Sequence, residues 1–566
     1  MHSRSWCLAM AKTATSFRTT AHINCKHLLF HNLKRVVFLF VIEMVGINGF
    51  GIPNYSNSNV ALHYLYLSIE ASDTSTYLNA EAEIHGTTKD LPPVFFLSSQ
   101  LTITEVKLLN QDTPYQHVND SLVLFGLSQP GNFEIKVSYQ GYPGPENWIA
   151  GVFNKEHRET KTWVTWTLSE PFSAYAWYPA IHGLHDKIDS LQIDLITPPG
   201  CIGVSNGIMA NTAALPNGNR LCSWKSNYPT PYYLVSYAIG NYLEHSFYAP
   251  LSNGDSVHIK NYLYNDSTYL ANNLANIEQI KPLIRLYDSL FGPYPFINEK
   301  YGHCTAPMGG GMENQTVSTV HNFSFNLLAH ELAHQWVGNS VTCSSFNHIW
   351  IHEGLASYAE YMAIENLVSV QGAKDWLEGC MRDAMLANDG RVYAQNSEVY
   401  DIGKLFNGRL RYNKGACLVH MIRHTVDNDS LFYGFIKAFC HKYKYGTAGI
   451  DDFKNLLEQQ TGLDFTDFFN QWYYGEGHIR TAYSWKIEHS GIEVKIKQQG
   501  SAPDKVPYFK TPIEVAIESQ NKTQVYRLFL SQPEQIFTFK VKQPKKVKKV
   551  VLDPDNWLLM KVERKL

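Results

Sequence analysis

Two histidines and a glutamate in one short segment have the spacing needed to hold a metal ion and to activate water beside it. The segment reads His330-Glu331-x-x-His334. Residues four positions apart lie on one face of a helix, so both imidazoles can reach the same ion, and the glutamate between them can reach its water. Taken alone, the pattern also fits an ordinary pair of surface or core histidines.

A second glutamate at a fixed spacing supplies the missing ligand. Glu353 follows His334 by nineteen residues and opens a second helical stretch, 354–366. Two helices joined by a short loop can bring this carboxylate beside the histidine pair. Two histidines and one glutamate form the ligand set of a catalytic zinc, whose fourth position is left to water. The spacing therefore predicts one zinc per chain, bound by His330, His334 and Glu353.

Further motifs give the chain a resemblance to the aminopeptidase N family of zinc peptidases, which includes leukotriene hydrolase. With H-E-x-x-H-x18-E, the motifs follow the order of that family, and the resemblance covers about residues 60–566. They are Gly310-Gly311-Met312-Glu313-Asn314, similar to G-x-M-E-N; Tyr412-Asn413-Lys414-Gly415-Ala416, similar to Y-x-K-G-A; and the segment 334–339, which reads HQWVGN.

The resemblance implies a catalytic role for two residues besides the zinc ligands. Glu331 is expected to act as general base, taking a proton from the attacking water and passing it to the leaving amine. The Tyr412 hydroxyl is expected to donate to the tetrahedral oxyanion. Zinc itself is expected to lower the pKa of its water and to polarise the scissile carbonyl. The implied reaction is removal of the first residue from a peptide.

Removal of the first residue requires groups that recognise a free amino terminus. Glu313 is the carboxylate that the resemblance implies, and Glu170, in the segment Ser169-Glu170-Pro171-Phe172, is the second candidate. The backbone at 309–312 is expected to lie along the substrate as an added strand edge does. The predicted substrate-binding set is Glu313, Glu170, Gly310, Gly311, Met312 and Asn314. The expected partners are peptides with a free N-terminus.

Two histidines depart from the family pattern. His352 stands where many members of the family carry asparagine, and His478 stands near a usual proline. Because Glu353 already completes the ligand set, His352 is expected to support the site or lie at the surface rather than bind the metal.

Two other functions stay open at this point. The same zinc chemistry would serve an endopeptidase or an epoxide hydrolase, and the fold could also serve as a catalytically dead binding scaffold. The intact set of zinc ligands, Glu331 and Tyr412 opposes the scaffold.

The pattern of the chain predicts a multidomain α+β protein. Alternating strands fill about 60–241, helical spacing begins near Asp266, and strands return after Gly477. We expect an N-terminal β-sheet domain over 52–245, a mainly helical catalytic domain over 246–480 that the resemblance makes thermolysin-like, and a small C-terminal β-sandwich over 481–566. The predicted helices cover about 270–290, 325–337, 354–366, 373–388, 414–425, 431–443, 451–460 and 467–474.

Composition excludes several other classes of protein. Among 566 residues, 44% are apolar and 17% charged, and the formal net charge is −3. A disordered chain would have more charge and fewer aromatic residues, and no global basic field exists to hold nucleic acid. Six lysines lie between Lys540 and Lys549; a solvated strand face explains them better than a basic patch. The nine cysteines are scattered, without C-x-x-C spacing, which predicts free buried thiols, although one or two disulfides stay open.

One N-terminal stretch has the order of a secretory signal peptide. Lys34 and Arg35 precede an apolar run over 36–42, and a small-x-small site follows at 49–51. The run is too short for a membrane span, so no integral membrane segment is expected. The pattern predicts that 1–51 is a targeting segment and that the protein is exported. The alternative is an apolar strand in a cytoplasmic protein. The oligomeric state is left open.

Overall fold

The computed structural model of the chain describes residues 59–489, 491–520 and 522–565. The predicted targeting segment, 1–51, lies outside these residues.

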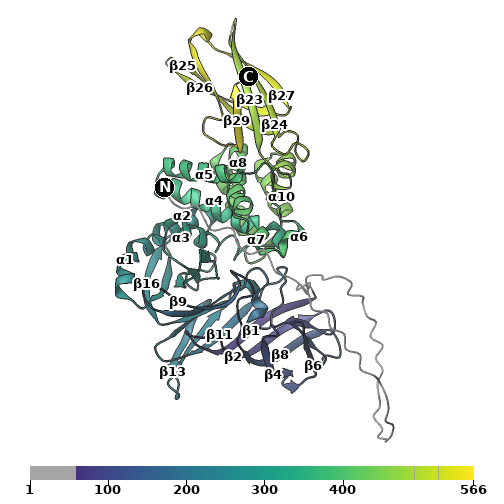
Figure 1. Ribbon diagram of the computed structural model, residues 1–566, viewed down its shortest axis with the longest axis vertical. Coiled ribbons are helices and arrows are strands. Elements are labelled where there is room, and N and C mark those ends of the chain that lie inside the picture. The colour runs from purple at the N-terminus through teal and green to yellow at the C-terminus, as the bar shows by residue number, and fades with distance from the viewer. Residues whose placement is uncertain (1–58, 490, 521, 566) are drawn as a thin grey trace, which may run out of the picture. The chain divides into compact units, whose positions relative to one another are not determined.

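The largest sheet is built from strands in which apolar residues alternate with more polar ones. In β8, Phe133, Ile135, Val137 and Tyr139 are buried while the residues between them are not. Figure 1 shows β1, β2, β8 and β11 side by side, and β1 pairs with β11 in parallel although more than 100 residues separate them. In spatial order the eight strands are β13 (Ile208–Ala214), β14 (Arg220–Ser226), β11 (Ser190–Thr197), β1 (Val60–Ala71), β2 (Leu78–Thr88), β8 (Gly131–Gly141), β4 (Leu101–Leu108) and β5 (Gln111–Asp112).

Two smaller sheets belong to the same part of the chain. One has the order β12 (Ile202–Ser205), β15 (Tyr237–Gly240), β10 (Trp163–Leu168) and β9 (Gly151–Glu156); the other has the order β3 (Val94–Phe96), β7 (Ser121–Leu124) and β6 (Tyr115–Val118). The end of β10 is important for the site, because Glu170 follows it by two residues.

A five-stranded sheet begins the next part of the chain. Its order is β16 (Tyr242–Pro250), β17 (Ser256–Tyr264), β18 (His303–Thr305), β20 (Ser318–Val320) and β19 (Gly311–Met312). β19 therefore lies at the edge of this sheet, and it consists of Gly311 and Met312 from the predicted substrate-binding set.

The helix predicted over about 270–290 is two helices, α1 (Ser267–Ile277) and α2 (Ile280–Phe291). Pro282 accounts for the break between the two helices. Proline has no N–H to donate to the carbonyl of Glu278, and its ring clashes with that carbonyl in a continuous helix.

Further helices surround the histidine motif. They are α3 (Phe325–Ala333), α4 (Trp350–Leu367), α5 (Val370–Ala384), α8 (Lys414–Val426), α9 (Asp429–Lys442) and α10 (Ile450–Thr461), with the short α6 (Asn396–Val399), α7 (Ile402–Leu405) and α11 (Thr466–Phe468). Two π-helical turns also occur, Gly408–Asn413 and Phe469–Tyr473. The second takes the place of most of the helix predicted over 467–474. The two-stranded sheet β21 (Thr342–Cys343) and β22 (Thr447–Ala448) joins distant parts of this region.

Glycines allow α4 and α8 to approach closely. A Cβ added to Gly415 would lie 2.8 Å from Trp350 Cδ1 and 3.0 Å from Gly354 Cα. The Trp350 indole N–H donates to the Gly415 carbonyl at 3.0 Å. This contact fixes the start of α4, where Glu353 lies, against the start of α8.

The last strands form two sheets. One has the order β27 (Glu534–Lys540), β24 (Gly491–Gly500), β23 (Ile479–Glu488) and β29 (Met560–Lys565), and the other β26 (Thr523–Leu530), β25 (Thr511–Ser519) and β28 (Val547–Leu552). The Tyr483 hydroxyl joins the sheets by donating to the Val550 carbonyl at 2.8 Å. All six lysines between Lys540 and Lys549 are exposed, whereas Val547 and Val550 are buried. Only Lys540, at the end of β27, and Lys548 and Lys549, in β28, lie in strands, so the six lysines do not form a single strand face.

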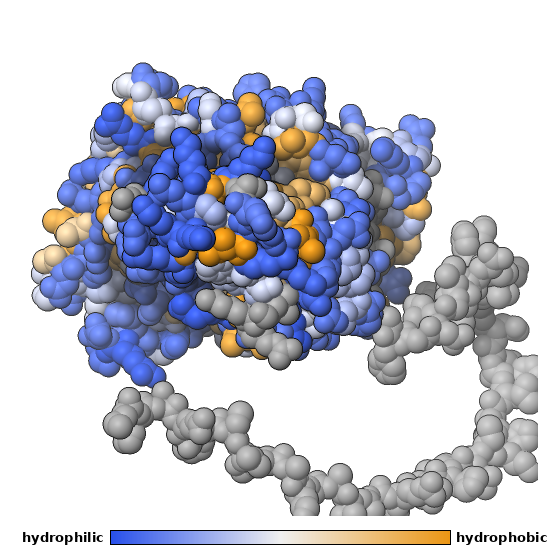
Figure 2. Space-filling model, turned by 90° about the horizontal axis from the view of Figure 1, so that it is seen from above, coloured by the Kyte–Doolittle hydropathy of each residue, from blue (hydrophilic) through white to orange (hydrophobic). Residues whose placement is uncertain are grey.

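Several further predictions can be compared with the described residues. Seven cysteines lie in this part of the chain, and all are buried and free. No helix within it is both long enough and apolar enough to span a membrane. On the face drawn in Figure 2, hydrophobic residues form small groups among hydrophilic ones, as on the surface of ordinary folded domains.

Candidate active site

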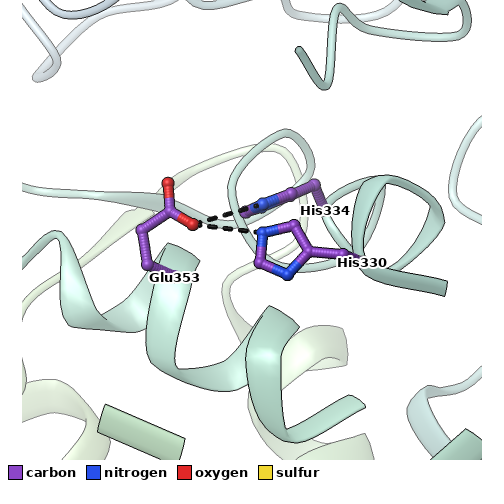
Figure 3. A group of neighbouring side chains, drawn as sticks. All are labelled: His330, His334 and Glu353. Carbon is purple, nitrogen blue, oxygen red and sulfur yellow. Dashed lines mark hydrogen bonds and ion pairs between the residues drawn. The ribbon is translucent and has the colours of Figure 1, made fainter. Parts of the chain in front are cut away.

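Three predicted metal ligands meet where α3 ends and α4 begins. His330 lies in α3, His334 caps its C-terminus, and Glu353 lies in the first turn of α4. One carboxylate oxygen of Glu353 is 3.2 Å from His330 Nε2 and 3.6 Å from His334 Nε2. Figure 3 shows this carboxylate turned toward both rings.

The other nitrogen of each imidazole is held in place. His330 Nδ1 lies 3.0 Å from a carboxylate oxygen of Glu360, and His334 Nδ1 lies 3.1 Å from the Val337 carbonyl oxygen. Both acceptors place the proton on Nδ1 and leave the Nε2 lone pairs directed at the shared space. Burial opposes charge on the Glu353 carboxylate. In the metal-free state, where the rings can also carry protons on Nε2, their hydrogen bonds to Glu353 outweigh burial and lower the Glu353 pKa. Two imidazole nitrogens and one carboxylate are a donor set that zinc prefers, so His330, His334 and Glu353 fit that ion.

Glu331 lies in the same cavity and is available as a base. It is buried, and Oε2 has no hydrogen-bond partner among the described residues. A Cβ on Gly311 would lie 2.3 Å from Oε1, so only glycine leaves room there for the carboxylate. Burial raises the Glu331 pKa to about 8; the two histidines lower it, and the Glu313 and Glu353 carboxylates raise it further.

Tyr412 reaches the site from the π-helical turn that precedes α8. Its ring stacks on His330 with centroids 6.0 Å apart. Burial, followed by the nearby Glu353 carboxylate, raises the Tyr412 pKa well above its ordinary value. The phenol therefore keeps its proton and can donate it in a hydrogen bond. Single π-helical turns are frequent at functional sites because they redirect a side chain.

Glu170 and Glu313 bring two more carboxylates to this cavity. Both are buried, and Oε1 of each has no hydrogen-bond partner within the described ranges. Burial raises the pKa of both groups; the Glu313 carboxylate raises that of Glu170 further. Glu313 Oε1 lies 3.9 Å from His334 Nδ1, too far for a hydrogen bond. Buried carboxylates without a hydrogen-bond partner are costly, so the pair is suited to a cationic ligand.

The cavity itself has a volume of about 470 Å³. The edge strand β19 lines the cavity with Gly311 and Met312, and Gly310, just before the strand, lines it too. The apolar wall includes Trp148, Leu168 and Phe406. Asn314, the remaining member of the predicted set, is not among the lining residues; its amide N–H donates to Thr319 Oγ1 at 3.0 Å.

Three supporting residues escaped the sequence analysis. Glu360 orients His330, and it lies seven residues after Glu353, two helical turns along one face of α4, which is a detectable signal. Asn339 Nδ2 donates to the Glu313 carbonyl at 2.7 Å, and Gln335 Nε2 does so at 3.4 Å. Both belong to the HQWVGN segment, but nothing in their spacing indicates this contact.

The two histidines that depart from the family pattern are both buried. His352 Nε2 accepts the backbone N–H of Cys343 at 2.7 Å, and burial lowers the His352 pKa to about 3. Burial lowers the His478 pKa to about 4. His352 therefore lies under the site and not at the surface.

Comparison with known proteins agrees with this geometry. Residues 278–472 match the Peptidase family M1 domain. Aminopeptidase M1-B of Oryza sativa subsp. japonica is 30% identical over 156 residues, which are 27% of this chain and 18% of that protein. Endoplasmic reticulum aminopeptidase 1 of Mus musculus is 25% identical over 227 residues, which are 36% of this chain and 24% of that protein. The aligned region thus spans less than a quarter of these relatives.

Solved structures resemble the chain over a larger share. The M1 zinc metallopeptidase of Deinococcus radiodurans aligns with a TM-score of 0.63 at 18% identity, covering 72% of this chain and 92% of that one. A mutant of it bound to a Tyr-Ser-Ala substrate aligns with a TM-score of 0.62, covering 73% and 93%. At this identity the likeness establishes the fold, an N-terminal multi-sheet β domain joined to a mainly helical domain.

Proposed function

We propose that this chain, which carries a Peptidase family M1 domain at residues 278–472, is a zinc-dependent aminopeptidase that removes N-terminal residues from peptides. One observation carries the proposal: the His330, His334 and Glu353 ligand set shares a cavity with the carboxylates of Glu170 and Glu313, whose Oε1 atoms accept no hydrogen bond from the described residues. The first group suits a hydrolytic metal, and the second suits a terminal ammonium.

Zinc, when held by the three ligands, supplies a Lewis acid for the scissile carbonyl and makes its water a stronger nucleophile. Glu331 accepts a proton from the attacking water and delivers it to the leaving nitrogen, so one carboxylate serves both halves of the reaction. Its Oε2 accepts no hydrogen bond from the part of the chain that the structure describes, which leaves a lone pair free for this transfer.

Tyr412 donates its hydroxyl proton in a hydrogen bond to the oxygen on which negative charge develops. A donor placed in advance lowers the barrier because it need not reorganise during the reaction. The raised pKa keeps the hydroxyl protonated at neutral pH.

The peptide backbone and the terminal amine fix the register of the substrate. The free edge of β19 offers backbone N–H and C=O groups to an extended peptide, as in strand addition. Glu170 and Glu313 accept charge-assisted hydrogen bonds from the ammonium, which are the strong kind. An internal peptide bond offers no such cation and leaves both carboxylates unpaired.

Matched anilide substrates test this proposal. We expect cleavage of unblocked amino-acyl anilides, with activity lost to a chelator and restored by zinc. N-acetylated versions should be cut at least about a hundredfold less well, a gap of near 2.7 kcal/mol. Equal rates on both forms, or internal cuts in a long peptide, would favour the endopeptidase. A zinc-loaded protein without any hydrolytic activity would favour the scaffold.

A further inference from the structure

Exposed lysines gather at one end of the two C-terminal sheets, although they come from several elements. Three lie in β27 and β28, three in the connection between these strands, and one in the turn between β25 and β26. We call this set the basic tip, and its members are Lys522, Lys540, Lys542, Lys545, Lys546, Lys548 and Lys549.

The strand register brings these lysines together. Lys540 pairs with Gly491, the first residue of β24. Val547, the first residue of β28, pairs with Ser519, the last residue of β25. Both sheets therefore end at the basic tip. Sheets that pack face to face lie about 10 Å apart, which is also about the Debye length at 0.1 M salt, so the lysines of both sheets contribute to one local field.

The opposite end of the same sheets contacts the helices (Figure 1). Ser501, which follows β24, donates its hydroxyl to the Asn388 carbonyl at 2.6 Å. Asp555, which follows β28, forms an ion pair of 2.7 Å with Lys374 in α5. Since β24 has ten residues, the basic tip lies roughly 33 Å from the Ser501 contact. None of its lysines lines the cavity that the metal ligands share.

Most of the charge at the basic tip is not neutralised. Among the described residues, only Lys549 of this set has an acidic partner, the Glu518 carboxylate at 3.8 Å. On β23, by contrast, Lys486 pairs with both Glu488 and Glu493. The formal net charge of the chain is −3. The lysines are therefore a local concentration of positive charge and not a sign of general basicity.

Two exposed apolar side chains lie at the same end of the sheets. Ile487 is 46% exposed and pairs with Ile492, next to the start of β24. Val525 is 52% exposed and pairs with Ala516, near the end of β25. Figure 2 looks onto this end and shows small hydrophobic groups among hydrophilic residues. Lysines around exposed apolar side chains are typical of surfaces that bind the interface of an anionic membrane.

We propose that the basic tip docks this protein on an anionic lipid surface, with Ile487 and Val525 entering the headgroup region. Lysine is a hydrated point charge that suits a diffuse anionic surface, whereas recognition of single phosphates favours the planar fork of arginine. Single-stranded nucleic acid is bound through exposed aromatic rings, and none of the exposed aromatic residues in the described chain lies at this end. The docking does not depend on the proposed aminopeptidase function.

Co-sedimentation of the full chain with lipid vesicles tests this inference. Vesicles of phosphatidylcholine are compared with vesicles that also contain phosphatidylserine, at about 0.1 M and about 1 M salt. We expect binding only to the anionic vesicles and only at the lower salt, because the Debye length falls to about 3 Å at 1 M. Absence of binding to anionic vesicles at the lower salt would overturn the inference.

A triple substitution in the connection between β27 and β28 tests the surface itself. Lys542→Gln, Lys545→Gln and Lys546→Gln together should weaken binding about a hundredfold, since each lysine near an anionic membrane is worth about fivefold. Arginine at the same three positions keeps the charge and should bind as wild type does. These side chains are exposed, so thermal unfolding should not distinguish the variants from wild type.

The matched control removes the same charge from the N-terminal β part of the chain. Lys89→Gln, Lys155→Gln and Lys225→Gln together change three other exposed lysines and should leave vesicle binding unchanged. Equal losses in this control and in the triple variant of the basic tip would show that only net charge matters, and the docking surface would then be rejected.

An apolar substitution separates a lipid surface from a soluble polyanion. Ile487→Ser should weaken vesicle binding at least about threefold, because the side chain leaves water only in a lipid interface. Ile536→Ser is its control: Ile536 is 55% exposed but pairs with Lys495, further from the basic tip. If duplex DNA displaces the vesicles and Ile487→Ser binds as wild type does, the partner is a nucleic acid and the lipid assignment is wrong.

Discussion

At the scale of single residues, Glu331 is the side chain on which the proposed chemistry depends most. Glu331→Gln keeps the size of the side chain but cannot accept the proton. We expect kcat to fall by about 10²-fold or more, since general-base catalysis contributes 10²–10⁴-fold. Zinc content should stay at one per chain, because no ligand changes. Activity above a tenth of wild type would assign the base elsewhere.

The burial of Glu331 also predicts how stability depends on pH in the metal-free protein. Its folded-state pKa, about 8, lies above the ordinary value of 4.5. A raised carboxyl pKa means that the folded state holds the proton more tightly, so its stability contribution is lost as pH rises from about 5 to 8. After chelation, Glu331→Gln should match wild type near pH 5 and be more stable at pH 9. Thermal unfolding of both proteins across this range checks the sign; a difference that does not change with pH would contradict it.

Tyr412→Phe removes only the hydroxyl that is proposed to face the oxyanion. Because its bond strengthens in the transition state, kcat should fall while KM changes little. Removing one such donor typically costs about 10²–10³-fold in kcat. Near-wild-type kcat would reject the assignment, and a rise in KM alone would instead indicate a role in substrate binding.

Helix spacing predicted that His330, His334 and Glu353 would lie together, and the family resemblance pointed to Glu313; the structure brings these residues to one cavity, and their roles remain predictions. Neither indicated the environment of His352. Its acceptor nitrogen meets a backbone N–H of β21, and backbone contacts leave no trace in side-chain identity.

At the scale of elements, the glycine contact between α4 and α8 should control activity from outside the cavity. Gly415→Ala places a Cβ 2.8 Å from Trp350 and 3.0 Å from Gly354 Cα. Overpacking of this kind costs about 1–3 kcal/mol, and it would displace the turns that carry Glu353 and Tyr412. We expect lower thermal stability together with lower kcat.

Gly434→Ala is the control for helix propensity. Gly434 lies within α9, and a Cβ there would meet no atom within 4 Å. Alanine should stabilise this helix by about 0.5–1 kcal/mol and leave kcat unchanged. If Gly415→Ala behaves in the same way, the close approach of α4 and α8 has no energetic consequence.

Most helices could be predicted from periodicity, but their irregularities could not. The predicted helix over 354–366 begins earlier, at Trp350, so Glu353 lies inside its first turn rather than before it. The segment Gly408–Asn413 forms a π-helical turn, which holds one more residue per turn than an α-helix. Its sequence gives no sign of this extra residue. The predicted domain limits, 52–245, 246–480 and 481–566, remain predictions.

At the scale of the whole molecule, strand order was beyond sequence analysis. Alternation identifies strands but not partners, and the parallel pairing of β1 with β11 joins segments on either side of several other strands. Glu170, which follows β10, lines the cavity together with residues of α3 and α4, so one cavity residue comes from the N-terminal β part of the chain. No local pattern around 170 could have required this.

Zinc removal should destabilise the protein, because its three ligands join two helices. An ion that binds only the folded state stabilises it by about 2.7 kcal/mol at a hundred times Kd and about 4.1 kcal/mol at a thousand times. For a cooperative unit of 150–250 residues, each kcal/mol shifts Tm by about 2–4 °C. Chelation should therefore lower the Tm of at least one transition by several degrees, and added zinc should restore it. Glu353→Gln should show the lower Tm without chelator and respond weakly to zinc, whereas Glu331→Gln, which keeps all three ligands, should respond as wild type does. A Tm that is indifferent to chelation in the wild-type protein would mean that the histidine pair and Glu353 are held together without an ion, and the metal assignment would then fail.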